Sequence, residues 1–201
     1  MPVNVSCAIA SPAQLPPGIT LLEDIINAQP APLTVPDLLD ARAAKQPDRV
    51  AIEVRGGGSL TYGGWRVQAL RAARGLLDAG VRPGELGALR FTDREWDAYA
   101  VAVLAVHYAG AAALPLRADL TEPEAVRLAD ICGATTVLRG TELPVLAVDL
   151  GWANLALVDV EAAGDAPAGP GPSLGRRRTG PAPADLAQVV GTSGTTGDPK
   201  G

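Results

Sequence analysis

Residues 85–116 read ELGALRFTDREWDAYAVAVLAVHYAGAAALPL, and this stretch decides the fold. An apolar run at 85–91 precedes a longer run with helical character at 95–108, and a second short apolar run follows at 111–116. Two short apolar runs joined by a helix are typical of a strand–helix–strand unit whose parallel strands are covered on both faces. The stretch therefore predicts an α/β protein built on a parallel sheet.

The same alternation continues on both sides of this unit. Thr34 and Thr121 each open a Thr-x-Pro-acid pattern, which is typical of a capped helix start, and a helix over 65–77 is expected to end at Gly80. Further strands are expected at 49–54, 60–62, 134–138, 145–149, 155–160 and 186–191. Strands alternating with helices indicate a largely parallel sheet with flanking helices.

Composition divides the chain into four parts. Residues 1–33 form a Pro-rich tail, and residues 34–160 carry the α/β pattern. Residues 161–185 contain five Pro and five Gly among 25 residues, which is typical of a linker. Residues 186–201 are expected to form one more strand and a phosphate-binding loop.

Charge and composition exclude several classes of protein. With 17 basic and 22 acidic side chains among 201 residues the net charge is −5, so nucleic acid is not expected as a partner. Two cysteines are too few for a four-cysteine zinc site and one histidine is too few for an all-nitrogen metal site, so no metal-ligand set is predicted. Residues 98–116 lack Asp, Glu, Lys and Arg, but Gly110 and Pro115 interrupt them, which favours a buried helix and strand over a membrane span. We expect a cytoplasmic protein without a membrane partner.

The residues that carry chemistry are TSGTTGDPKG, positions 192–201. Glycines let main-chain N–H groups converge on an anion, hydroxyls add donors, and Lys200, one of only two lysines, adds a cation. Asp198 and Pro199 separate Gly197 from Lys200, so the loop is not a Walker-type P-loop. The candidate polyphosphate-binding residues are Thr192, Ser193, Gly194, Thr195, Thr196, Gly197 and Lys200.

This loop resembles the phosphate-binding core motif of the adenylate-forming superfamily at nine of its ten positions. That superfamily comprises acyl-CoA and aryl-CoA synthetases, the adenylation domains of nonribosomal peptide synthetases, and luciferases. Residues 60–62 (LTY), 80–85 (GVRPGE) and 108–116 (YAGAAALPL) are similar to three further motifs of the family. The resemblance covers residues 34–201, and the segment 91–116 looks slightly more like a free-standing acyl-CoA synthetase.

The resemblance implies that the chain forms the first part of the large N-terminal domain of such an enzyme. It also implies a two-step reaction, in which a carboxylic acid and Mg-ATP give an acyl-adenylate and pyrophosphate. The thiol of coenzyme A or of a phosphopantetheine carrier then takes the acyl group. ATP and Mg²⁺ are the implied cofactors, and the family's loop binds the β- and γ-phosphates. The family's catalytic residues follow this motif, so no catalytic residue is assigned and the 201 residues are expected to be inactive alone.

Two alternatives remain open on the residues themselves. The chain could be a truncated, non-catalytic remnant, or an unrelated nucleotide- or phosphate-binding module with a similar loop. Away from the loop, His107 and Cys132 are interpreted as core residues. Asp93, Glu95 and Asp97 are interpreted as a solvated helix start.

Overall fold

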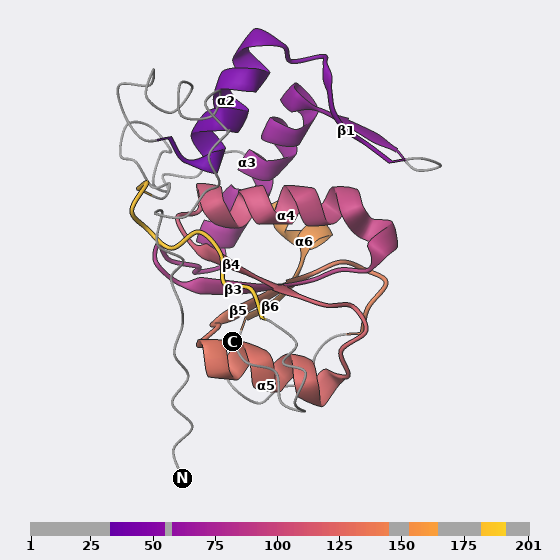
Figure 1. The fold of residues 1–201 in the computed structure, drawn as a ribbon, viewed down its shortest axis with the longest axis vertical. Coiled ribbons are helices and arrows are strands. Elements are labelled where there is room, and N and C mark those ends of the chain that lie inside the picture. The colour runs from indigo at the N-terminus through magenta and orange to yellow at the C-terminus, as the bar shows by residue number, and fades with distance from the viewer. Residues whose placement is uncertain (1–32, 55–57, 145–152, 165–181, 192–201) are drawn as a thin grey trace, which may run out of the picture.

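The computed structural model describes residues 33–54, 58–144, 153–164 and 182–191, which form the coloured ribbon of Figure 1. The elements follow in the order α2 (Val35–Lys45), β1 (Val50–Glu53), β2 (Ser59–Thr61), α3 (Tyr62–Asp78), β3 (Leu86–Arg90), a 3₁₀ turn (Asp93–Glu95), α4 (Trp96–Tyr108), β4 (Ala112–Leu116), α5 (Glu122–Cys132), β5 (Thr136–Arg139), β6 (Ala153–Ala156) and α6 (Leu157–Gly164).

Four of these strands form a parallel sheet in the order β4-β3-β5-β6. All five residues of β3 are buried, which explains why the strand is apolar up to Arg90, its last residue. Strands β1 and β2 pair separately as an antiparallel hairpin. The predicted α/β fold with a largely parallel sheet is thus confirmed.

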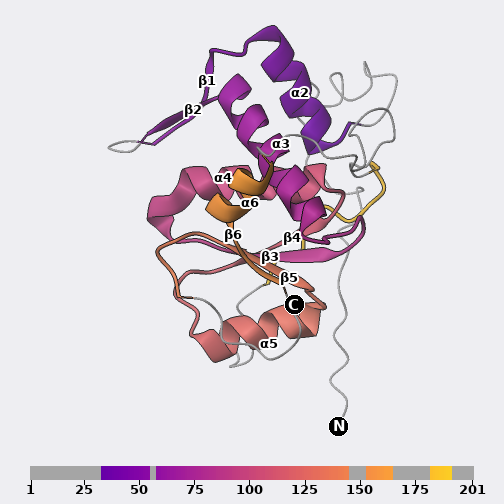
Figure 2. The ribbon, with the colours of Figure 1, turned by 180° about the vertical axis from the view of Figure 1, so that it is seen from behind.

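Helices cover both faces of the sheet, and Figure 1 shows α4 on one side and α5 on the other. The first core lies between the sheet and helices α3, α4 and α6, which gather on the same face in Figure 2. The second and smaller core lies between the sheet and α5. Alanines dominate the contact of α3 with α4, because Ala69, Ala73, Ala102 and Ala105 are all fully buried.

The helix starts follow the predicted capping chemistry. At α2, the Thr34 hydroxyl accepts from the N–H of Asp37 (3.3 Å), and the Asp37 carboxylate accepts from the N–H of Thr34 (2.9 Å). Thr121 and Glu124 repeat this arrangement at α5. Helix α5 ends at Gly133, whose φ of 76° is the left-handed conformation that favours glycine.

A partly buried polar contact joins α2 to the next two helices. Asp40 of α2 accepts from the Tyr108 hydroxyl (2.7 Å) and from Arg66 Nε (2.6 Å). Burial, followed by the bond to Asp40, raises the pKa of Tyr108 well above its ordinary value. The phenol therefore stays protonated at neutral pH, and its O–H donates a hydrogen bond to the Asp40 carboxylate.

The structure corrects the strand expected at 155–160. Strand β6 ends at Ala156, and Leu157 begins helix α6. Leu157 and Val160 are buried three residues apart, so one face of a helix packs on the core where a strand was expected. A short apolar run does not distinguish these two possibilities.

The last predicted strand is shorter than expected. Within 186–191 only Gln188 forms a bridge, parallel to Ala113 of β4. The strand expected at 145–149 lies outside the described residues. The boundary between 160 and 161 falls within α6, and the four-part division of the chain stays a prediction.

Candidate functional site

The carboxyl ends of β3 and β4 lie beside each other in the sheet. Strand β3 continues into α4 on one face, whereas β4 continues into α5 on the opposite face. We call the place where these two connections diverge the switch point, and the strand order itself reverses one strand further, between β3 and β5. Open α/β sheets bind ligands outside the carboxyl ends of their strands.

A cavity of about 410 Å³ lies at this switch point. It is lined by the chain that follows β3 (91–93), by Trp96 and Tyr99 of α4, by the chain around the end of β4 (115–118), and by Val190 and Gly191. Its volume is in the range of small-molecule sites. One wall is aromatic, because Phe91 and Tyr99 meet edge to face with their ring centres 6.0 Å apart.

Two charged side chains line this cavity, Asp93 from the turn after β3 and Arg117 from the loop after β4. Arg117 donates from Nε to the Asp119 carboxylate over 2.9 Å. This hydrogen bond lowers the pKa of Asp119, although both side chains are about two-thirds exposed. The Arg117 guanidinium thus lies beside the cavity, where Asp119 and Asp93 offset its charge.

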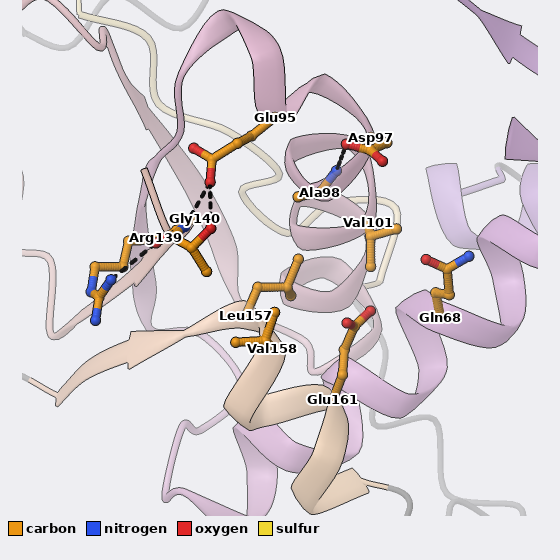
Figure 3. Close-up of a pocket in the computed structure, with 11 residues that line it drawn as sticks. Gln68, Glu95, Asp97, Ala98, Val101, Arg139, Gly140, Leu157, Val158 and Glu161 are labelled. Atoms are coloured by element: carbon orange, nitrogen blue, oxygen red, sulfur yellow. Dashed lines mark hydrogen bonds between the residues drawn. The ribbon is translucent and has the colours of Figure 1, made fainter. Parts of the chain in front are cut away.

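Glu95 ties together two loops at the carboxyl edge of the sheet. Its carboxylate accepts from the N–H groups of Thr92 (3.0 Å), Thr141 (2.6 Å) and Glu142 (3.1 Å). Figure 3 shows it reaching the turn after β5, where a Cβ on Gly140 would lie 2.1 Å from Glu95 Oε1. Asp93 and Asp97 are exposed at the helix start, as expected, whereas Glu95 is partly buried and also binds the turn after β5. The Thr92-x-x-Glu95 capping pattern was the signal in the sequence that pointed to this role.

The same contacts fix the charge of Glu95. Burial by itself raises the pKa of Glu95, but the main-chain N–H groups of Thr92, Glu142 and Thr141 together hold it below its ordinary value of 4.5. Because the pKa is lower in the folded state, the unfolded chain binds more protons in acid. The stabilisation by Glu95 is therefore present above about pH 4.5 and is lost as pH falls through the lowered pKa.

We expect Glu95→Gln to be less stable than the wild type at neutral pH, with the difference shrinking in acid. The protonated carboxyl and the amide then offer the N–H groups similar neutral acceptors. Urea unfolding of both proteins from about pH 7 to about pH 3 measures this difference. A difference that stays constant over this range would contradict the assignment.

His107 attaches the segment before the predicted loop to the sheet. The carbonyl of Ala187 accepts from His107 Nε2 (2.9 Å) and from the N–H of Ala113 (2.9 Å), while the N–H of Val189 donates to Ala113 (2.9 Å). Burial lowers the pKa of His107, so the ring is neutral at neutral pH and Nε2 carries the proton. His107 is 4% exposed, which confirms its interpretation as a buried residue.

The predicted phosphate-binding residues Thr192, Ser193, Gly194, Thr195, Thr196, Gly197 and Lys200 lie outside the described residues. The structure places only the residue before them, Gly191, which lines the cavity. Gly191 faces α5, and a Cβ there would lie 3.2 Å from Leu128. The role of the loop therefore stays a prediction, and the structure gives only the position of Gly191, the residue that precedes it.

Within the described ranges, no group of three or more His, Cys, Asp or Glu side chains is arranged to hold a metal ion. None of the helices in these ranges combines the length and the apolar character needed to cross a bilayer.

Comparison with known proteins identifies the family of this chain. A model of the family described as AMP-binding enzyme matches residues 39–201. Phenyloxazoline synthase MbtB of Mycolicibacterium paratuberculosis is 35% identical over 94% of this chain and 16% of its own length. Surfactin synthase subunit 2 of Bacillus subtilis is 33% identical over 86% of this chain and 4% of its own length. The chain thus spans less than a fifth of these relatives.

Solved structures agree on the fold. The N-terminal subdomain of Klebsiella oxytoca NpsA, in complex with 3-hydroxybenzoyl-AMSN, matches 82% of this chain and 39% of its own with a TM-score of 0.65 and 23% identity. The o-succinylbenzoate coenzyme A synthetase MenE of Bacillus subtilis, in complex with AMP, matches 80% of this chain and 40% of its own with a TM-score of 0.62 and 20% identity. From the family match across residues 39–201, the chain belongs to the AMP-binding enzyme family.

Proposed function

We propose that this chain is the N-terminal part of an AMP-forming acid–thiol ligase. Such an enzyme activates a carboxylic acid with ATP to an acyl-adenylate and then transfers the acyl group to a thiol. One observation carries the proposal: the segment 187–191 lies beside β4 and ends at the switch-point cavity. The loop that begins at Thr192 thus starts where open α/β sheets bind ligands.

In this proposal the loop binds the phosphates of ATP. Main-chain N–H groups at Gly194 and Gly197 and the hydroxyls of Thr195 and Thr196 donate to phosphate oxygens, and Lys200 supplies a positive charge. Bound ATP and Mg²⁺ supply the electrophilic α-phosphate and screen the charge of the pyrophosphate. The described cavity supports this proposal by its volume, which is in the range of small-molecule sites, and by its aromatic wall; its charged lining residues are Arg117 and Asp93.

The relatives support both thiol acceptors. The matched curated proteins include peptide synthetases such as nonribosomal peptide synthetase 30 of Fusarium vanettenii, whereas MenE is a coenzyme A synthetase whose structures include a complex with ATP and magnesium. We therefore keep coenzyme A and a phosphopantetheine carrier as acceptor classes. We also propose that the 201 residues alone form no acyl-adenylate.

We expect Lys200→Ala to weaken binding of Mg-ATP and of pyrophosphate to this chain by about 10- to 100-fold. A charge-assisted hydrogen bond contributes about 1.5–3 kcal/mol, which corresponds to this change in Kd. Lys45→Ala is the matched control, since Lys45 is the only other lysine and is exposed in the last turn of α2. Calorimetric titration of the three proteins measures the effect.

Exchange of pyrophosphate into ATP separates the ligase from its alternatives. The product of the complete reading frame is expected to catalyse exchange that depends on a carboxylic acid, and the 201-residue chain is expected to catalyse none. Binding without exchange in the complete product, with aryl, fatty and amino acids all supplied, would instead identify a phosphate-binding module. A chain that binds neither ligand would be a remnant.

A further inference from the structure

Two arginines lie side by side where β3 and β5 end. Arg90 and Arg139 are register partners of these neighbouring parallel strands. One residue earlier, Leu89 and Leu138 belong to the core beneath α4, and two residues earlier Ala88 and Val137 belong to the core beneath α5. Because side chains alternate between the faces of a strand, both arginines are on the α5 face of the sheet, at its carboxyl edge.

Both guanidinium groups have buried donors without acceptors. Arg90 is only 4% exposed and donates from Nη1 to the carbonyl of Pro144 (3.0 Å). Arg139 donates from Nη1 to the carbonyl of Gly140 (3.0 Å). The Nε atoms of both side chains are buried and have no hydrogen-bond partner. A guanidinium carries five N–H donors, and among the described residues the Nε–H of each arginine is left without an acceptor.

Their charges also lack a counter-charge within the described residues. In the described residues, the arginines that form ion pairs with Asp are others, namely Arg66, Arg74 and Arg117. Figure 3 shows the guanidinium of Arg139 turned away from the carboxylates of Glu95, Asp97 and Glu161. Arg90 is buried and Arg139 is half-buried, and two neighbouring cations shielded from water are unfavourable without an anion.

We propose that Arg90 and Arg139 together form a binding site for a phosphate group. Paired guanidinium forks bind a tetrahedral dianion, whose several oxygens can accept from both arginines, better than a single carboxylate, which one fork satisfies. The site lies between β3 and β5 on the α5 face, whereas the switch-point cavity lies between β3 and β4. The phosphate is either inorganic or part of a nucleotide, and the chemistry of recognition is the same.

We expect inorganic phosphate, compared with chloride at equal ionic strength, to raise the Tm of the 201-residue chain. At about a hundredfold excess over Kd the rise should be about 5 °C. Arg139→Gln should abolish this rise, whereas Arg94→Gln, which removes an exposed arginine nearby, should leave it unchanged. Pyrophosphate and ATP serve as parallel ligands that distinguish free phosphate from a nucleotide phosphate.

Arg90→Leu gives a second and sharper test. Without phosphate this variant should be at least as stable as the wild type, because a buried charge without a partner is removed. With phosphate it should be the less stable protein, since it no longer binds the anion. Equal Tm values for the wild type in phosphate and chloride would overturn the proposal.

A further variant separates this site from the proposed ligase function. In Lys200→Ala the rise in Tm with phosphate should persist, because the arginine pair is intact. If the rise is lost in Lys200→Ala and kept in Arg139→Gln, the phosphate binds the loop and the arginine site is refuted. Failure of the exchange experiment leaves the phosphate effect on Tm unaltered.

Discussion

Gly75→Ala is expected to lower the free energy of unfolding by about 3 kcal/mol, because it forces helices α3 and α6 apart. A Cβ on Gly75 would lie 2.0 Å from the carbonyl oxygen of Val160 and 2.7 Å from its carbon. Both are main-chain atoms, so no side-chain rotation relieves the overlap. In an open helix the same change would stabilise by about 0.5–1 kcal/mol, so the predicted sign depends on the contact with α6.

Gly58→Ala is the matched control for this prediction. A Cβ on Gly58 meets no atom within 4 Å, so this variant should unfold within about 0.5 kcal/mol of the wild type. Urea titration followed by circular dichroism measures both variants. If Gly75→Ala were as stable as the wild type, the close crossing of α3 and α6 would be absent in solution.

Leu138→Ala is expected to lower the free energy of unfolding by about 2–5 kcal/mol. This effect is similar in size to that of Gly75→Ala, but it arises from a cavity left in the core. Leu138 is fully buried in β5, an inner strand of the sheet, and belongs to the core shared with α3 and α4. Fully packed neighbours on both sides leave little room for the site to collapse, so most of the lost volume should remain empty.

Val67→Ala controls for shortening an aliphatic side chain in a helix. Val67 is 46% exposed on α3, so its truncation should change the free energy of unfolding by less than about 1 kcal/mol. The same urea titration applies. A Leu138→Ala protein as stable as Val67→Ala would show that β5 is not packed as the structure describes.

Much of the fold follows from local sequence. The Thr-x-Pro-acid starts at Thr34 and Thr121 each form a cap within four residues of chain, so no distant contact is needed to read them. The strand–helix–strand unit at 85–116 can also be predicted from local sequence, because its two strands are short, apolar and separated by a single helix. Gly133 ends α5 for a conformational reason that is likewise local.

Other features depend on what the chain packs against. The run 155–160 fits a strand or a helix by its composition, and contact with α3 decides for α6. Glu95 accepts locally from the N–H of Thr92, but the N–H groups of Thr141 and Glu142 come from the turn after β5, which lies 46 residues away in the sequence. Arg90 and Arg139 are 49 positions apart, and only the sheet register makes them neighbours.

The sequence by itself determined the fold class, the helix starts and the family, because strand and helix periodicity, capping and the glycine- and hydroxyl-rich loop are all encoded within a few consecutive residues. Only the tertiary structure shows where in space the residue before that loop lies. His107 and β4 hold the segment before Thr192 at the switch point, and the opposite placement of α4 and α5 opens the cavity beside it. These are contacts between distant residues, which no local pattern specifies.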